Sequence, residues 1–214
     1  HAMIEEVTAS KMKEKCLPFS VALALQCFAN EYVFSETEEE KEAVEKLEQR
    51  IALLTKKGHP VPPSFVVALG TYRPLYRFPW AQELSERGWA SNIKDVIKRQ
   101  ITEPLEEQSL RDQIPCITDI QNTISQSVRA QYEENPYPRW IKTDIAYKSW
   151  SLDAVLKGPP LLFDLGDYTS PESPEILVAG CGTGQHALYT ASKFTNAQVL
   201  AVDLSLNSLA YAQR

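Results

Sequence analysis

The stretch ILVAGCGTGQHA, residues 176–187, decides how the C-terminal part of the chain folds. It begins with apolar residues, carries glycine at the alternate positions Gly180, Gly182 and Gly184, and continues into residues that can sustain a helix. Glycine is needed where the backbone takes a positive φ or where a ligand must approach without a Cβ in the way, and a helix N-terminus offers free N–H groups to an anion. The pattern therefore predicts a strand over residues 175–179, a tight ligand-binding turn and the start of a helix.

A second apolar run extends this unit. Residues 198–202 have the length of a strand, and residues 184–194 between the two runs can form a helix. A strand, a helix and a second strand predict a β-α-β unit with a right-handed crossover, and Ser205 can cap a further helix. Asp203 ends the second strand, where its carboxylate can accept hydrogen bonds from both ribose hydroxyls of an adenosine.

The spacing of the glycines separates two classes of ligand. Dinucleotides bind turns of the form G-x-G-x-x-G, whereas S-adenosylmethionine binds the looser form G-x-G-x-G. Position 185 is glutamine and the glycines alternate, so the pattern favours the second class. We expect neighbouring atoms to crowd Gly182, so that a branched side chain there would disturb the turn or block the cofactor. The alternative is that the glycines only form a tight connection.

The same residues resemble those of a known family. VAGCGTGQHA (178–187) and LAVDLS (200–205) resemble the first and second motifs of class I S-adenosylmethionine-dependent methyltransferases. The upstream stretch 103–140, which ends in QYEENPYPRW, is similar to bacterial methyltransferases often joined to tetratricopeptide repeats, although the repeats themselves are absent from this chain. The resemblance implies a Rossmann-like sheet that binds S-adenosyl-L-methionine. It assigns cofactor binding to Ala179, Gly180, Cys181, Gly182, Gly184, Gln185, Asp203 and Leu204.

The N-terminal part of the chain has a helical pattern. The apolar segment 20–34 suits a helix buried in a bundle. Ser35-Glu36-Thr37-Glu38 has the spacing of a capping box, and Lys56, Lys57 and Gly58 can end the helix that it starts, with Val44, Leu47, Ile51 and Leu54 on its apolar face. Further helices are expected at 64–72, 80–87, 92–101, 104–113 and 119–134.

Prolines divide the helical part from the glycine turn. Six of them punctuate residues 135–174, which leaves room for one short helix at 151–156. The expected organisation is thus a helical domain (4–134), a Pro-rich connector (135–174) and a partial S-adenosylmethionine-binding Rossmann-like domain (175–214), in the α/β class. Residues 1–3, His-Ala-Met, are typical of a cloning remnant and are left out of this division.

The connector begins with NPYP, residues 135–138, which is similar to the N-P-P-Y signature of amino-methyltransferases. A circularly permuted enzyme is rejected, because only about 41 residues separate Pro138 from Gly180 and two β-α units need more. Two interpretations stay open. The segment is either a rigid aromatic connector or a lid over the cofactor, and the lid residues would be Tyr132, Asn135, Tyr137, Arg139 and Trp140.

Composition narrows the classes of function. The net charge of −6 argues against indiscriminate binding to nucleic acid or to anionic membranes, and no apolar run approaches the ~20 residues that a membrane span needs. The four cysteines form no C-x-x-C pair, which favours reduced thiols over a metal site or disulfides and indicates a cytoplasmic setting. No metal ligand is therefore assigned.

The leading hypothesis is methyl transfer from S-adenosyl-L-methionine to an unidentified acceptor by a full-length protein. Only part of the sheet of such a fold is present, so the chain is expected to be truncated, inactive by itself, and able to form homo-oligomers through the incomplete sheet. No residue stands out as the catalytic base, since Glu133 and Glu134 qualify by position only. The alternative is a non-catalytic helical protein-interaction module that carries a remnant of the methyltransferase fold.

Overall fold

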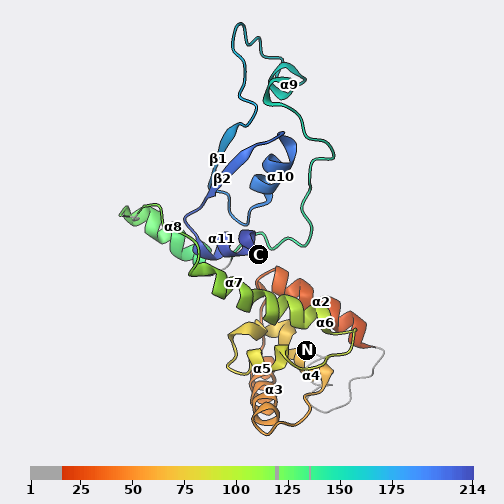
Figure 1. Cartoon of the computed structure of the whole chain (residues 1–214). Helices are drawn as coiled ribbons and strands as arrows, with labels where there is room; N and C mark the ends of the chain where they lie inside the picture. The colour runs from red at the N-terminus through yellow and green to blue at the C-terminus, as the bar shows by residue number, and fades with distance from the viewer. Residues whose placement is uncertain (1–15, 119–120, 135) are drawn as a thin grey trace. The chain divides into compact units, whose positions relative to one another are not determined.

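A computed structural model describes residues 16–118, 121–134 and 136–214 (Figure 1). These residues form a mixed structure of helices and one two-stranded parallel sheet. The chain divides into two compact units, with the boundary between Glu106 and Glu107 inside helix α7 (Glu103–Arg111). This boundary lies upstream of the limit at residue 134 expected from the sequence, so the segment 107–134 belongs to the second unit. None of the helices in the described part of the chain has the length and apolarity to cross a membrane.

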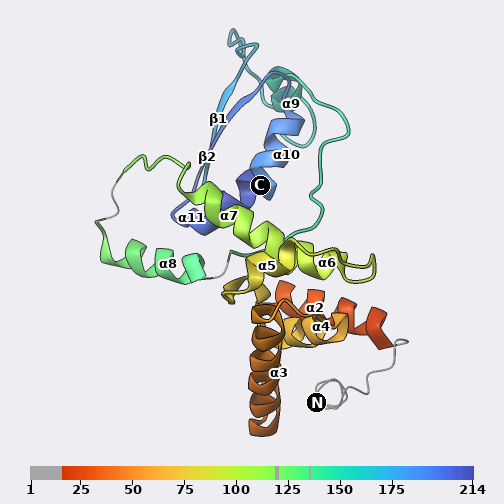
Figure 2. The ribbon, with the colours of Figure 1, turned by 60° about the horizontal axis from the view of Figure 1, so that its bottom comes forward.

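The first unit is built around two helices, α2 (Leu17–Ala29) and α4 (Pro63–Tyr72), which pack side by side (Figure 2). Helix α4 is buried along most of its length, and α3 (Glu38–Lys56) packs against it. Short turns follow in η2 (Leu75–Arg77) and α5 (Ala81–Ser85). The most deeply buried apolar side chains of this core are Ala24, Ile51, Val66, Val67, Ala68, Leu69, Leu75, Leu84, Ile93, Val96 and Ile101.

Helix α2 differs from the expected helix 20–34. It begins three residues earlier, ends at Ala29, and buries one face rather than most of its surface. The chain leaves the helix at Glu31 and Tyr32, whose φ values are 53° and 56°. The Tyr32 hydroxyl donates to the Gly70 carbonyl (3.2 Å) and to Gln100 Oε1 (3.3 Å). These long-range partners hold Tyr32 out of the helix.

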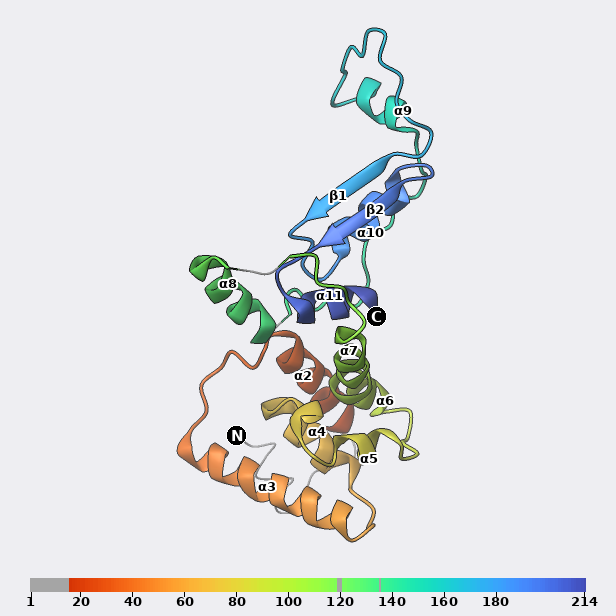
Figure 3. The ribbon, with the colours of Figure 1, turned by 60° about the vertical axis from the view of Figure 1, so that its left-hand side comes forward.

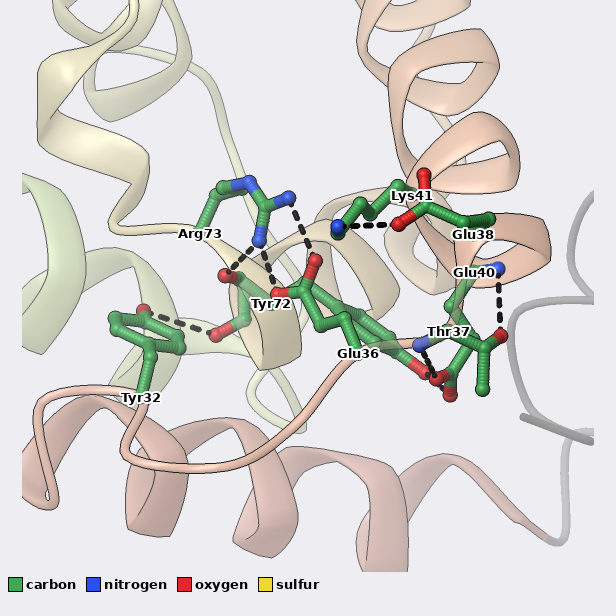
Figure 4. A network of polar contacts seen from close by, with 9 residues as sticks. Tyr32, Glu36, Thr37, Glu38, Glu40, Lys41, Tyr72 and Arg73 are labelled. Atoms are coloured by element: carbon green, nitrogen blue, oxygen red, sulfur yellow. Dashed lines mark hydrogen bonds and ion pairs between the residues drawn. The ribbon is translucent and has the colours of Figure 1, made fainter.

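The capping box of α3 lies two residues beyond the expected one. The Thr37 N–H donates to Glu40 Oε2 (2.9 Å) and the Glu40 N–H donates to Thr37 Oγ1 (3.2 Å). Ser35 is not the cap, because Arg73 binds both carboxylate oxygens of Glu36 and holds that residue outside the helix (Figure 4). The expected end is confirmed, since the helix stops at Lys56 and Gly58 has a φ of 65°. Its expected buried face is confirmed at Val44, Leu47 and Ile51.

The two helices expected at 92–101 and 104–113 follow one another without a break. Helix α6 (Lys94–Ile97) runs into a π-helical turn, η3 (Lys98–Thr102), and then into α7. Pro104, which lacks an N–H, sits at the start of α7 and changes the helix type instead of ending the helix. Gln100 lies in the π-helical turn η3, and its side chain is in the core. There its Nε2 donates to the carbonyls of Ala24 and Gly70, both at 2.8 Å.

The second unit contains the sheet. Strands β1 (Glu175–Ala179) and β2 (Gln198–Val202) have the bounds expected from the sequence and pair in parallel, with Leu177 opposite Leu200 (Figure 3). Helix α10 (Gln185–Lys193) connects them and covers one face, on which Val178 is buried. Leu177 and Leu200, on the other face, are 63% and 57% exposed.

Three more helices belong to the second unit. Helix α8 (Thr123–Glu134) starts where Asn122 Oδ1 accepts the N–H groups of Ile124 and Ser125; residues 119 and 120 of the expected helix 119–134 lie outside the described residues. Helix α9 (Leu152–Lys157) is capped by Ser151, within one residue of the expected range. Helix α11 (Leu206–Gln213) is capped by Ser205 Oγ, which accepts the Ser208 N–H at 3.1 Å, as expected.

Candidate cofactor-binding turn

The three glycines after β1 all take a positive φ. The angles are 69° at Gly180, 53° at Gly182 and 89° at Gly184, in the left-handed region that favours glycine. The N–H groups of Gly180 and Cys181 donate to the Val202 carbonyl at 2.8 and 3.0 Å, so the turn folds against the end of β2. The sequence-based expectation of a tight turn between strand and helix is confirmed.

Space around the glycines is uneven. A Cβ at Gly180 or Gly182 would meet no atom within 4 Å, whereas a Cβ at Gly184 would lie 2.7 Å from the Cβ of Ala212. The expectation that neighbours crowd Gly182 is therefore wrong. The close contact is at Gly184, where α11 packs on the start of α10, and the backbone at Gly180 and Gly182 borders open space.

Asp203 is bound to the turn. Its Oδ2 accepts the Gly182 N–H and its Oδ1 accepts the Ser205 N–H, both at 2.8 Å. Each carboxylate oxygen has a second lone pair, so the group keeps acceptor capacity for two hydroxyl donors. The carboxylate thus joins the glycine turn to the start of α11 and still has the chemistry to bind a diol.

The remaining residues assigned to cofactor binding have mixed surroundings. Ala179 and Leu204 are exposed, and Gln185 is the first residue of α10. The N-cap residue of α10 is Gly184, which has no side chain to cap the helix. Cys181 is buried, and burial, assisted by the charge of Asp203, raises the pKa of its thiol. The thiol is accordingly neutral at neutral pH and acts as a small apolar group.

Thr183, which the sequence did not single out, holds the middle of the turn. Its Oγ1 donates to the Pro138 carbonyl at 2.9 Å, and its own carbonyl accepts the indole Nε1–H of Trp140 at 2.9 Å. Thr183 is only 2% exposed. Its position as an intervening residue of G-x-G-x-G carried no signal for this role.

The residues considered as a lid lie in different places. Trp140 is hydrogen-bonded to Thr183 of the turn. Arg139 Nη1 lies 3.8 Å from Glu107 Oε2. Tyr137 is 65% exposed. Tyr132 is also exposed, and its backbone carbonyl accepts the Ser205 hydroxyl. Asn135 lies outside the described residues.

Glu133 caps a helix. Its carboxylate accepts the N–H of Leu206, the first residue of α11, and lies 3.5 Å from Arg111 Nη2 and 3.7 Å from Arg129 Nε. The Glu133 carbonyl accepts the side-chain amide of Asn207. The Glu133 carboxylate is thus engaged by a helix N-terminus and by two guanidinium groups.

Within the described residues, no group of three or more His, Cys, Asp or Glu side chains is arranged to hold a metal ion. In comparisons with known proteins, no protein-family model, curated protein or solved structure matches the chain.

Proposed function

We propose that the glycine turn binds S-adenosyl-L-methionine and that the protein takes part in methyl transfer from this cofactor. The observation that carries the proposal is the open backbone at Gly180 and Gly182, next to the carboxylate of Asp203. A nucleoside can approach such a backbone because no Cβ stands in the way. In this proposal β1, α10 and β2 are the first part of a Rossmann-like sheet.

Two groups of this chain fit the two ends of the cofactor. Asp203 would accept hydrogen bonds from the ribose hydroxyls through its remaining lone pairs. The N-terminus of α10, whose N-cap residue is glycine, would attract the carboxylate of the methionine part. When bound, the cofactor supplies an electrophilic methyl group on a sulfonium. The protein's contribution is to bind and orient it, and no residue is assigned as a base.

Calorimetry with S-adenosylmethionine and NAD tests the proposal. We expect binding of S-adenosylmethionine in preference to NAD. Asp203→Ala should weaken it by about 1–3 kcal/mol, or roughly 5- to 150-fold in Kd, because the ribose loses a charged acceptor. Asp167→Ala removes the same charge from an exposed site in the same unit and should leave the affinity unchanged. Preference for NAD, absence of binding, or equal affinity of wild type and Asp203→Ala would overturn the assignment.

Because Asp203 also holds the turn, the loss of affinity needs a structural control. Asp203→Asn keeps an acceptor for one of the two backbone N–H groups but places an amide NH₂ opposite the other. We expect both Asp203 variants to keep their α10 and β2 amides protected from hydrogen exchange. Loss of that protection would assign the carboxylate a structural role in place of cofactor binding.

A further inference from the structure

Residues 136–140, here called the strap, are hydrogen-bonded to the glycine turn in both directions. The strap donates to the turn through Trp140 Nε1 and accepts from it through the Pro138 carbonyl, in each case with Thr183 as partner and at 2.9 Å. Thr183 is buried, so water cannot readily replace either bond. The strap and the turn are thus joined at one residue by two independent bonds.

The strap is itself anchored on other elements of the second unit. The hydroxyl of Tyr211 in α11 donates to the Trp140 carbonyl, and the two rings meet edge to face with centroids 5.7 Å apart. Arg139 lies 3.8 Å from the carboxylate of Glu107, which also accepts Arg214 Nε at 2.9 Å. These contacts give the strap a defined position from which to hold Thr183.

The turn needs such support because of its composition. Thr183 stands between Gly182 and Gly184, and glycine loses more backbone entropy on ordering than any other residue. Fixing the carbonyl and the side chain of Thr183 fixes the peptide planes on both sides of it. One of these planes adjoins Gly182, whose N–H Asp203 accepts, and the other carries the Gly184 N–H and leads into the N-terminus of α10.

We propose that the strap is a positioning element for the glycine turn, with Trp140 and Thr183 as its positioning residues, and that order in the strap is coupled to cofactor binding. The coupling rests on the proposed function, whereas the positioning of the turn does not. A ligand that requires the ordered turn must also stabilise whatever orders it, because coupling between two sites is reciprocal. S-adenosylmethionine should therefore slow hydrogen exchange in the strap.

Two variants remove the two bonds separately. Trp140→Phe deletes the indole donor and keeps an aromatic ring against Tyr211, whereas Thr183→Val deletes the hydroxyl and keeps the branched shape. Each should raise the exchange rates of the Gly182 and Gly184 amides in the free protein by about 5-fold and weaken S-adenosylmethionine binding by about 5-fold, the effect of one hydrogen bond. Trp150→Phe makes the same chemical change at a half-exposed tryptophan of the same unit and should do neither.

Thr183→Ser serves as the rescue. It restores the hydroxyl and should return both exchange and affinity to wild-type values. If Thr183→Ser behaves like Thr183→Val, Thr183 acts by packing and its positioning role through hydrogen bonds is overturned. If Trp140→Phe has no more effect than Trp150→Phe, the positioning role of the Trp140 hydrogen bond is overturned.

The outcomes also separate this inference from the proposed function. Suppose that the wild type binds S-adenosylmethionine and that Trp140→Phe and Thr183→Val change neither the hydrogen exchange of the turn nor the affinity. This result would overturn the positioning role of the strap and leave the proposed function in place. Suppose instead that the wild type binds no S-adenosylmethionine but that the two variants accelerate hydrogen exchange in the turn. This result would support the positioning role of the strap and overturn both the proposed function and the coupling to cofactor binding.

Discussion

A matched pair of alanine substitutions tests how the glycine turn is packed. Gly184 and Gly182 both have positive φ, 89° and 53°, so alanine at either position adopts a left-handed backbone at a cost of about 1–2 kcal/mol. At Gly184 the new Cβ would also lie 2.7 Å from the Cβ of Ala212, closer than two carbons can pack. Helix α11 or the turn must then shift, which costs about 1–3 kcal/mol more. Gly182→Ala adds no such contact.

The expected destabilisation is therefore about 2–5 kcal/mol for Gly184→Ala and about 1–2 kcal/mol for Gly182→Ala. Native-state hydrogen exchange of the β1 and β2 amides is the suitable assay, because the chain has two compact units and a single global melt does not report on one of them. Equal destabilisation by the two variants, or a larger effect at Gly182, would refute the packing of α11 on Gly184.

The same pair separates stability from binding. Over Gly182 the new Cβ enters open space, which the proposed cofactor would occupy. Gly182→Ala should thus weaken S-adenosylmethionine binding while the fold persists, and Gly182→Val should abolish it. Calorimetry on a folded Gly182→Val protein checks this, and an unchanged affinity would show that the turn is only a connection.

Two further predictions concern helix ends. Glu133→Gln should raise the exchange rate of the Leu206 amide by about 5-fold, since a charged cap worth about 1 kcal/mol is lost from α11; an unchanged rate would contradict the cap. At the start of α3, hydrogen bonds from the Thr37 backbone and from Tyr72 lower the pKa of Glu40 below its ordinary 4.5. The contribution of Glu40 is thus complete above pH 4.5 and lost as the pH falls below that value, so Glu40→Gln should flatten the pH dependence of α3 helicity by circular dichroism in the acid range. An identical pH profile for the variant would exclude this role.

Patterns of short range were enough to place the sheet and the turn. Strands β1 and β2 have the expected bounds because each is a short apolar run bordered by turn residues. The positive φ angles at the glycines of the turn and at Gly58 are accessible because glycine has no Cβ, and the turn and helix-end patterns that contain them are local. Asp203 was placed beside the turn by the parallel pairing of two strands joined by one helix.

Long-range contacts decided the helix limits that the sequence placed wrongly. The end of α2 depends on the bonds of Tyr32 to Gly70 and Gln100, and the start of α3 depends on the pairing of Glu36 with Arg73. Local propensity does not contain these partners. It favours Ser35 as a cap and continues α2 through the apolar residues up to Phe34, because nothing nearby in the sequence opposes either choice.

In the candidate site, too, local sequence patterns predict some features and long-range contacts decide the others. The sequence by itself determined the glycines, the strand ends and Asp203, because these depend on residue type and on spacings of a few residues. Only the tertiary structure placed Trp140 on Thr183 and Glu133 on the first turn of α11. Each of these contacts closes a long loop of chain, and which donor meets which acceptor across such a loop depends on how the intervening elements pack. A rule based on the spacing of residues in the sequence does not include that packing.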